Sequence, residues 1–343
     1  MREIDPIVLA AVRKYNSEGL KEFANKQTIQ SWQLNQLQSI SLDGQIQRSL
    51  RKITEWYYKW DGKVYVSISG RDSAVLLHLV RSLFPDVVGV YCNTGLEHPE
   101  VREYIETLDN IIWIKPELTF KQVLEKYGWP IVSKEVSQKI NEVRTTKSEK
   151  LRNYRMNGAD NKYKSGKIPE KWKFLIKAPF KISDKCCEVM KKRPFKKFEK
   201  KTGLRPIIGT MADDSKFRRQ SFLKYTCNAF GLKRPCSRPL STWLHAHILE
   251  YVERLGLLIP ACYAWVDHTG CLYCGFGVHL EPEPNRFQAM SVHQPVLHNY
   301  IINKIGMGVV LDFIGVPYRM KKTYKEGELA LEDSPQLPTE RPE

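Results

Sequence analysis

The stretch from Val64 to Leu79 constrains the fold of this chain most strongly, because it combines a strand pattern, a polar turn and a helix pattern. Apolar residues recur over Val64–Ile68 and predict a buried strand. The apolar run after the turn predicts a helix capped by Asp72 or Ser73. A turn of this kind offers unpaired N–H groups and a partial positive charge, which together bind phosphate. The turn Ser69–Ser73 is therefore a candidate phosphate-binding site, although an ordinary β–turn–α corner has the same pattern.

Strand and helix patterns alternate through residues 63–133. Strands are predicted at 64–68, 87–92 and 111–114, and they are followed by helices at 74–84, 99–108 and 120–127. This alternation predicts an α/β fold with a parallel sheet covered on both faces. Ligands of such sheets bind beyond the carboxyl ends of the strands. A second polar segment, Asn93-Thr-Gly-Leu-Glu97, lies at such an end, and we expect it to face Ser69–Ser73 across a nucleotide.

The sequence outside this core divides into further regions. We expect a helical N-terminal extension at 1–62, a nucleotide-binding domain at 63–260 with a basic insertion at 134–182, a cysteine-containing helical region at 261–320 and a disordered tail at 321–343. Within the main domain, a strand at Ile207–Thr210 leads into a helix that carries Arg218. A further helix is predicted from Pro239 to Leu255, with Ser241 as its cap and Gly256 at its end.

The positive charge is concentrated in one part of the chain. The formal net charge is +16, and 23 Lys and Arg against 8 Asp and Glu lie between Lys134 and Arg205. A field of this kind attracts nucleic acid or a highly charged nucleotide, although a solvated basic surface is the alternative. No apolar run reaches the roughly 20 residues that span a bilayer, and the N-terminus lacks the apolar core of a signal peptide. We therefore expect a cytoplasmic protein with no membrane partner.

Two pairs stand out among the eight cysteines: Cys186-Cys187, and Cys271 with Cys274 in a Cys-x-x-Cys segment. Four thiolates bind zinc or an iron–sulfur cluster. Adjacent cysteines chelate one tetrahedral ion poorly but can bind two irons of a cluster, which favours [4Fe–4S] over zinc. The alternative is two buried cysteines and a separate redox-active or inert Cys-x-x-Cys pair.

Several of these segments resemble a known family. Ser69-Gly-Arg-Asp-Ser73 resembles the Ser-Gly-Gly-Lys-Asp-Ser loop, or PP-loop, of the N-type ATP pyrophosphatases, and Asn93–Glu97 resembles their Asp-Thr-Gly-Leu-Glu segment. From about Lys63 to Val316 the chain is similar to the phosphoadenosine phosphosulfate (PAPS) reductase family, especially to members from phages and mobile elements. The further landmarks of this resemblance are Ile131–Lys134, Phe180–Cys187, Ile208–Ala212, Thr269–Gly277 and Asn285–Phe287.

The resemblance implies a Rossmann-like core of the adenine nucleotide α-hydrolase type and a bound ATP or PAPS. The residues that it assigns to the nucleotide are Ser67, Ser69, Gly70, Arg71, Asp72, Ser73, Thr94, Gly95 and Glu97. With 83 residues between Cys187 and Cys271, the cysteine pattern also resembles the cluster motif of assimilatory adenylylsulfate reductases. This implies a [4Fe–4S] cluster on Cys186, Cys187, Cys271 and Cys274. The DNA-phosphorothioation sulfurtransferase, a relative, similarly joins a PP-loop to a cluster.

The sequence departs from the family pattern in two ways. Its PP-loop is one residue shorter, and Arg71 stands where the pattern has Lys. Sulfonucleotide reductases also carry a nucleophilic cysteine in a C-terminal Glu-Cys-Gly-x-His motif, whereas this sequence has no cysteine after Cys274.

Three functional hypotheses follow. In the first, the protein is a sulfur-transfer enzyme that adenylates an acceptor, releases pyrophosphate and accepts sulfur from a donor, with nucleic acid bound by the basic span 134–205. Its catalytic residues would be Arg71, Asp72, Lys134 and Arg218, with Mg²⁺, and the three cations would neutralise developing charge. In the second, it is a PAPS reductase that releases sulfite and uses a thioredoxin-like reductant. In the third, it is a degenerate member that binds nucleic acid without catalysis.

Overall fold

The computed structural model describes residues 28–158 and 166–320. The expectations for residues 1–27, for the tail 321–343 and for the middle of the basic insertion at 159–165 lie outside these ranges. The chain divides into two compact units, of which one extends to Gly277 and the other begins at Val278. None of the helices in the described ranges is both long enough and apolar enough to cross a bilayer.

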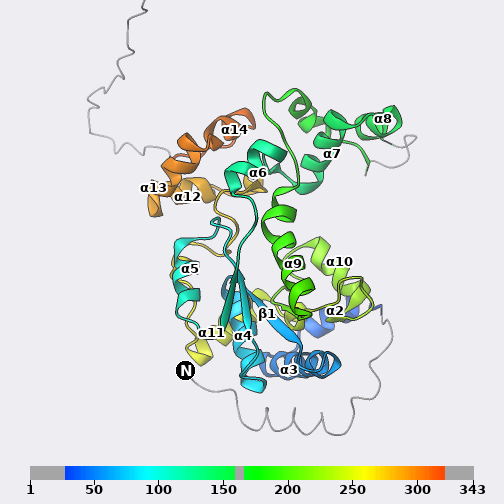
Figure 1. Cartoon of the computed structure of the whole chain (residues 1–343), viewed down its shortest axis with the longest axis vertical. Coiled ribbons are helices and arrows are strands. Elements are labelled where there is room, and N and C mark those ends of the chain that lie inside the picture. Colours follow the sequence, from blue (N-terminus) through cyan, green and yellow to red (C-terminus); the bar gives the residue numbers. More distant parts are fainter. Residues whose placement is uncertain (1–27, 159–165, 321–343) are drawn as a thin grey trace, which may run out of the picture. The chain divides into compact units, whose positions relative to one another are not determined.

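A six-stranded sheet lies at the centre of the first unit (Figure 1). The strand order is β3 (Ile111–Ile114), β2 (Gly89–Cys92), β1 (Val64–Ile68), β5 (Arg205–Ile208), β7 (Cys236–Ser237) and β6 (Asn228–Ala229). The first five of these strands are parallel, and only β6 pairs antiparallel. The order reverses between β1 and β5, and such a switch point is where α/β sheets bind ligands. The predicted α/β fold class is therefore confirmed.

Helices cover both faces of this sheet. On one face, alternate side chains of β1 (Val64, Val66 and Ile68) join a large apolar core. The helices that contribute to this core are α3 (Leu42–Lys59), α4 (Arg71–Leu83), α5 (Pro99–Glu106) and α11 (His245–Leu255). On the other face, Tyr65 of β1 packs against Phe198 of α9 (Arg193–Thr202). Each fully buried aliphatic side chain contributes about 1.5–3 kcal/mol, so the two cores hold β1 firmly.

Two predicted helices differ from the structure. Helix α4 begins at Arg71 with Gly70 as its cap, three residues earlier than predicted, because Ser73 Oγ accepts the Ser69 and Gly70 N–H groups from inside the first turn. The helix predicted from Pro239 to Leu255 is broken. Its first part is a short 3-10 helix, η4 (Pro239–Thr242), and α11 begins only at His245. The break follows from the burial of Trp243, whose Nε1 donates to Ser49 Oγ at 2.8 Å.

The remaining helices of the first unit lie around this core. Helix α2 (Ser31–Gln38) packs against α10 (Lys216–Tyr225) through Leu34 and Phe222. The strongly basic region from residue 134 holds α7 (Lys134–Thr145), α8 (Glu149–Asn157) and the 3-10 helix η2 (Glu170–Lys177). Before it come α6 (Phe120–Tyr127) and β4 (Ile131–Val132), which pairs in parallel with β8 (Gly275–Phe276).

The second unit is a succession of short helices. They are η6 (Val278–Leu280), α12 (Arg286–His293), α13 (Pro295–Asn299), the π-helix η7 (Tyr300–Lys304) and α14 (Met307–Phe313), and neighbours from α12 onward pack on one another. Asn285 caps α12 by accepting the Phe287 and Gln288 N–H groups. Its Nδ2 also donates to the Pro317 carbonyl at 2.6 Å, which ties the end of the unit to its beginning.

Candidate functional site

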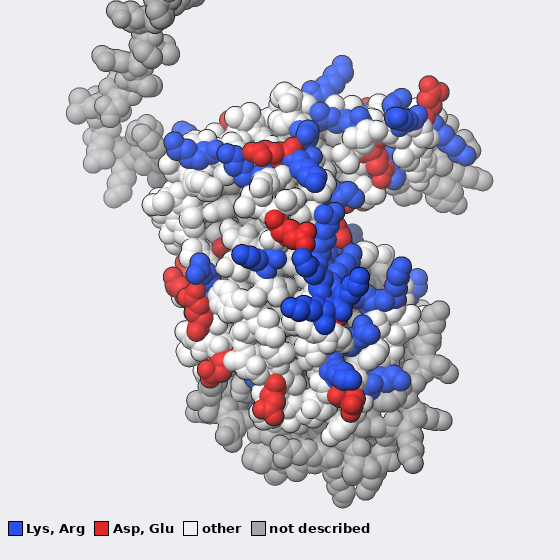
Figure 2. Space-filling model, viewed as in Figure 1, with Lys and Arg blue, Asp and Glu red and all other residues white. Residues whose placement is uncertain are grey.

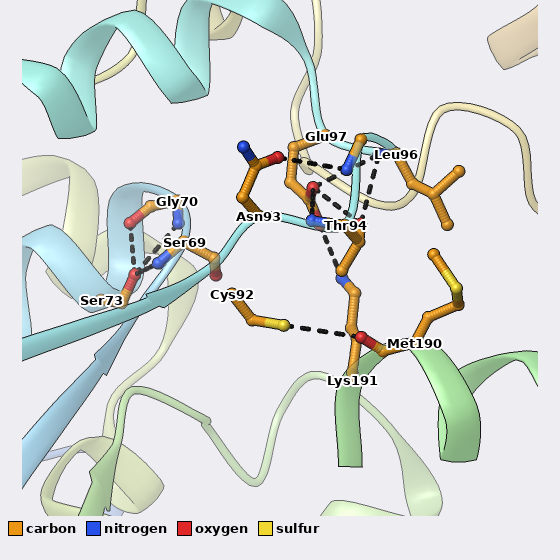
Figure 3. A network of polar contacts seen from close by, with 11 residues as sticks. Ser69, Gly70, Ser73, Cys92, Asn93, Thr94, Leu96, Glu97, Met190 and Lys191 are labelled. Carbon is orange, nitrogen blue, oxygen red and sulfur yellow. Dashed lines mark hydrogen bonds and ion pairs between the residues drawn. The ribbon is translucent and has the colours of Figure 1, made fainter. Parts of the chain in front are cut away.

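The PP-loop, Ser69–Ser73, lies at the carboxyl end of β1, as the strand–turn–helix pattern predicts (Figure 3). The Ser73 hydroxyl holds the loop together. Its Oγ accepts the N–H of Ser69 at 2.8 Å and of Gly70 at 3.0 Å, and it donates to the Gly70 carbonyl at 2.7 Å. The loop therefore keeps its tight shape without a ligand.

Arg71 fixes a second segment, residues 261–269, over this loop. We call it the cover segment; it begins with the 3-10 helix η5 (Ala261–Ala264). The Arg71 N–H donates to the Tyr263 hydroxyl at 2.8 Å, and the Arg71 guanidinium lies 4.5 Å from the centre of the Tyr263 ring. Its Nη2 also donates to the Asp267 carbonyl at 3.1 Å and lies 3.3 Å from His245 Nδ1. The Arg71 side chain is thus buried and positions the cover segment rather than extending into solvent.

Close packing of the cover segment explains the glycine in the loop. A Cβ on Gly70 would lie 2.4 Å from both the Tyr263 hydroxyl and Thr269 Oγ1, which are themselves 2.8 Å apart. The backbone N–H groups of Ser69, Gly70 and Arg71 all have hydroxyl partners as a result. A phosphate oxygen at the start of α4 would replace the Tyr263 hydroxyl as the partner of the Arg71 N–H.

Asp72 faces the end of β5, where the chain packs tightly on the loop. A Cβ on Gly209 would lie 3.0 Å from the Asp72 carbonyl oxygen. Burial raises the pKa of the Asp72 carboxyl; the Arg71 charge opposes this shift, and the Asp214 charge adds to it. Arg218 in turn forms an ion pair with Asp214, so it belongs to this side of the loop.

The other sequence-predicted residues of this region lie farther from these contacts. Ser67 is on β1 itself, in register with Val90 and Ile208 of the neighbouring strands. Lys134 is exposed at the start of α7 and makes no hydrogen bond or ion pair within the described ranges.

The second predicted segment, Asn93–Glu97, forms its own compact turn at the carboxyl end of β2 (Figure 3). Glu97 folds back so that its carboxylate accepts the Thr94 N–H at 3.2 Å and the Thr94 hydroxyl at 2.7 Å. Gly95 at the tip has a φ of +71°, and nothing would lie within 4 Å of a Cβ there. The tip of this turn is therefore open, whereas the Glu97 carboxylate is buried beneath it.

Lys191 connects this turn to the cysteines. Its Nζ lies 3.5 Å from Glu97 Oε1. Burial alone would lower the pKa of Lys191, but the negative charges of Cys271 and Glu97 outweigh it and the pKa is raised. Lys191 sits in η3 (Glu188–Lys192), a π-helix that directly follows Cys187. Short π-helical segments occur often at functional sites, because they turn side chains out of the ordinary helical register.

The structure brings together the four cysteines that the sequence singled out. Burial raises the pKa of the Cys186 thiol, and the nearby charges of Cys271, Cys187 and Cys274 raise it further. Cys271 likewise has its pKa raised by burial, while Lys191 opposes the shift. We call Cys186, Cys187, Cys271 and Cys274 the four-cysteine group.

Backbone contacts fix the Cys-x-x-Cys half of this group. The Leu272 N–H donates to the Leu96 carbonyl at 2.7 Å, so the segment is attached to the Asn93–Glu97 turn. The Phe276 N–H donates to Cys274 Sγ at 3.4 Å. Pairing of β8 with β4 follows immediately after Cys274.

Comparison with known proteins agrees with these features. Residues 63–274, from the start of β1 to the last cysteine, match the phosphoadenosine phosphosulfate reductase domain. The chain belongs to the PAPS reductase family. No curated protein sequence matches it.

A solved structure also matches this PAPS reductase family chain. It is the crystal structure of phosphoadenylyl-sulfate (PAPS) reductase from Candida auris in a phosphate complex, with 11% sequence identity and a TM-score of 0.38. The match covers 70% of this chain and 94% of that chain. A TM-score this low adds no argument to the sheet topology described above.

A basic surface lies on the same unit of this PAPS reductase family protein. Figure 2 shows Lys and Arg side chains gathered over the part of the chain that contains α9. Pro194 and Phe198 turn one face of α9 toward the sheet, and the opposite face is exposed. We call the exposed cations of this helix, together with Lys192 directly before it, the basic face of α9: Lys192, Arg193, Lys196, Lys197, Lys200 and Lys201.

Three residues of the site have no counterpart in the sequence-based assignment. Tyr263 and His245 contact Arg71, and Lys191 contacts Glu97. Tyr263 lies in a segment without apolar periodicity, so no local pattern marks it. Lys191 carries a weak signal, since it follows the Cys-Cys pair by four residues in a basic run.

Proposed function

We propose that this PAPS reductase family protein is a PP-loop sulfur-transfer enzyme that activates a nucleic-acid acceptor with ATP. An acceptor oxygen would attack the α-phosphorus of ATP, and pyrophosphate would leave. A sulfide (HS⁻) sulfur would then displace AMP, which leaves with the former acceptor oxygen, so that sulfur replaces that oxygen in the acceptor.

The observation that carries this proposal is the short chain of contacts between the nucleotide segment and the cysteines. The Glu97 carboxylate binds the Thr94 hydroxyl on one side and Lys191 on the other, and the charge of Lys191 acts on Cys271. Leu96 and Leu272 add a direct backbone hydrogen bond between the same two segments. Sulfur chemistry at the cysteines would thus take place beside the bound nucleotide.

The four-cysteine group suits a [4Fe–4S] cluster. The charges of Cys271, Cys187 and Cys274 all act on the Cys186 thiol, so the four residues lie near one another. Within the described ranges, the group of donors that all lie within 4.8 Å of one another is elsewhere in the unit. Donors around one zinc ion lie about 3.5–4 Å apart, because Zn–S bonds are about 2.3 Å. A wider set of four thiols fits a cluster better than a single ion. With one thiolate on each iron, the cluster would hold the two cysteine segments in place beside the nucleotide.

The chain's own residues would bind and orient the reactants. The Arg71 N–H at the start of α4 would hold a phosphate oxygen after the Tyr263 hydroxyl gives up its hydrogen bond, while Ser73 Oγ continues to accept the Ser69 and Gly70 N–H groups. Arg71 would hold the cover segment in place. Arg218 and Lys134 would supply positive charge to the phosphates. Asp72 would be a ligand of Mg²⁺ on the phosphates.

Nucleic acid is the acceptor class that the surface favours. The basic face of α9 presents successive cations at helical spacing, and Lys200 and Lys201 have no ion-pair partner within the described ranges. Lys196 and Lys197 are partly neutralised, with Glu188 and Glu117 each at 2.9 Å. An array of this kind binds a phosphate backbone without reading its sequence.

PAPS reduction is the second candidate, because the matching domain is named for it. It would cleave the S–O bond of a sulfonucleotide to release sulfite, with electrons from a thioredoxin-like dithiol. The sequence offers no cysteine after Cys274 as the nucleophile, so a thiolate elsewhere in the chain would have to attack.

The first experiment is anaerobic purification followed by iron, sulfide and turnover assays. We expect about four iron and four sulfide per chain, lost in Cys271→Ser and retained in the control Cys236→Ser, a buried cysteine outside the group. Pyrophosphate release from ATP should depend on DNA or RNA, and labelled sulfur should enter the nucleic acid. Sulfite release from PAPS would favour the second candidate. Nucleic-acid binding without any turnover would leave a non-catalytic binding protein and overturn the proposal.

A further inference from the structure

Three side chains with metal-binding atoms meet at a second place in the first unit, away from the four-cysteine group. His98 caps the start of α5, Glu100 lies in its first turn, and Cys262 comes from η5. One ligand atom from each of the three lies within 4.8 Å of the other two. Helix α5 and η5 pack against each other, so the group joins two elements that are far apart in sequence.

The burial of this group requires an explanation. His98 is only 5% exposed and Cys262 is fully buried. His98 Nδ1 is buried and has no hydrogen-bond partner, which is rare for a polar atom in a protein interior. The Trp265 ring packs edge-on against the imidazole, with 5.0 Å between ring centres, and fixes its orientation. An imidazole held in this way beside a thiol and a carboxylate has the composition of a metal site.

We propose that His98, Glu100 and Cys262 bind one zinc ion. Imidazole nitrogen, carboxylate oxygen and thiolate sulfur are all common zinc ligands, whereas Mg²⁺ and Ca²⁺ avoid sulfur. Zn–N and Zn–S bonds of about 2.0–2.3 Å require donors about 3.5 Å apart, so small side-chain rotations close the present separation. Three protein ligands leave the fourth tetrahedral position to water.

The location gives this zinc a structural role next to the PP-loop. Cys262 directly precedes Tyr263, whose hydroxyl accepts the Arg71 N–H. Zinc would attach η5 to α5 through Cys262. The next residue of η5, Tyr263, contacts the PP-loop. Zinc would therefore determine how firmly the cover segment is held, whatever reaction the protein catalyses.

The test uses the full-length chain with Cys271→Ser and Cys274→Ser, so that zinc bound by the four-cysteine group cannot be mistaken for this site. We expect about one zinc per chain after dialysis against Zn²⁺. Cys262→Ser and Glu100→Gln should each weaken zinc binding by more than the roughly 10-fold that loss of an outer-shell partner costs. Cys236→Ser, at another buried cysteine, is the matched control and should bind zinc like the parent.

Two further measurements remain decisive if Cys262→Ser folds poorly. Co²⁺ added to the Cys271→Ser, Cys274→Ser parent should give a thiolate charge-transfer band that Glu100→Gln, a variant at a partly buried position, weakens. Zinc-edge X-ray absorption should show one sulfur with nitrogen and oxygen neighbours. Two or more sulfur neighbours, no bound zinc, or equal binding in Cys262→Ser and the parent would each overturn the proposal.

Discussion

The PP-loop and the four-cysteine group differ in whether their polar atoms already have partners. In the PP-loop, hydroxyls of Ser73 and Tyr263 accept the backbone N–H groups, so the loop is complete without a ligand. In the four-cysteine group, burial and the neighbouring thiols raise the pKa of Cys186 and of Cys271, and Lys191 opposes both shifts. In the proposed function, a nucleotide would therefore compete with an existing hydrogen bond, whereas a metal cofactor would bring together thiols that have no such partner to displace.

Gly70→Ala should have the largest effect on stability, because it changes the PP-loop where the cover segment packs on it. The new Cβ would lie 2.4 Å from the Tyr263 hydroxyl and from Thr269 Oγ1. The backbone at Gly70 is extended, with a φ of −129°, so the cost is steric. We expect the free energy of unfolding, measured in urea, to fall by about 2 kcal/mol. In the control Gly231→Ala nothing lies within 4 Å of the Cβ. A loss there of the same size would show that the cover segment does not press on the PP-loop.

Tyr263→Phe tests whether nucleotide competes with the hydroxyl. The variant removes the acceptor of the Arg71 N–H in the free protein and should lower its stability by about 1 kcal/mol. A bound phosphate restores the partner, so affinity for ATP measured by calorimetry should rise about fivefold.

The control for this variant is Tyr251→Phe. Tyr251 is buried and its hydroxyl contacts His78 Nδ1 at 2.7 Å, away from the loop. Tyr251→Phe should lose about as much stability as Tyr263→Phe, but it should bind ATP as tightly as the parent. Weaker ATP binding in Tyr263→Phe would mean that the hydroxyl stays in the nucleotide complex.

Lys191→Gln tests the connection between the two regions. Glu97 would lose its nearest cation, 3.5 Å away, but would keep the Thr94 donors. We expect stability to fall by up to about 1 kcal/mol in thermal unfolding. Lys192→Gln is the neighbouring control, because its side chain is 60% exposed and lies 3.9 Å from Glu188. Equal effects of the two substitutions would argue against a connecting role of Lys191.

Asp72→Asn should have the smallest effect, visible as a change in pH dependence. Burial raises the pKa of Asp72 in the folded protein, whereas a carboxyl in the unfolded chain ionises near about 3.9. Above that pH the unfolded state binds fewer protons, so this group's contribution to stability falls as the pH rises through the folded pKa.

Asp72→Asn should remove this loss of stability at higher pH. Its free energy of unfolding at pH 7 should exceed that of the parent by less than about 1 kcal/mol. Melting temperatures between pH 4 and 7 give the comparison, with the exposed Asp86→Asn as control. Parallel curves for the parent and Asp72→Asn would contradict the expectation.

The sequence predicted those parts of the molecule that depend on local pattern. The strands at Val64–Ile68, Gly89–Cys92 and Ile111–Ile114 were recognisable because apolar residues recur within short segments between turns. The PP-loop followed from the turn between a strand and a helix. Helices α7 and α8 carried no comparable signal, since few of their residues are apolar and α8 has none buried.

What the sequence did not predict depends on contacts between distant segments. Arg71 was assigned as a cation that neutralises developing charge, and its burial beneath Tyr263, almost 200 residues later, was not predicted. His245 was assigned no role in the site, yet it lies against Arg71. The grouping of His98 with Cys262 likewise exists only because α5 packs on η5. A single polar residue in a segment without periodicity gives no local sign of such a role.

The short pairing of β4 with β8 has a consequence for the order of events during synthesis. Ile131 and Val132 pair with Gly275 and Phe276, and the Cys-x-x-Cys segment ends immediately before this pairing. Contacts between segments so far apart form late, because most of the intervening chain must first be closed into a loop. On the ribosome, the strands that hold the PP-loop emerge long before Cys271 and Cys274. Insertion of the proposed cofactor would therefore be a late step, because both cysteine pairs must first be synthesised and brought together.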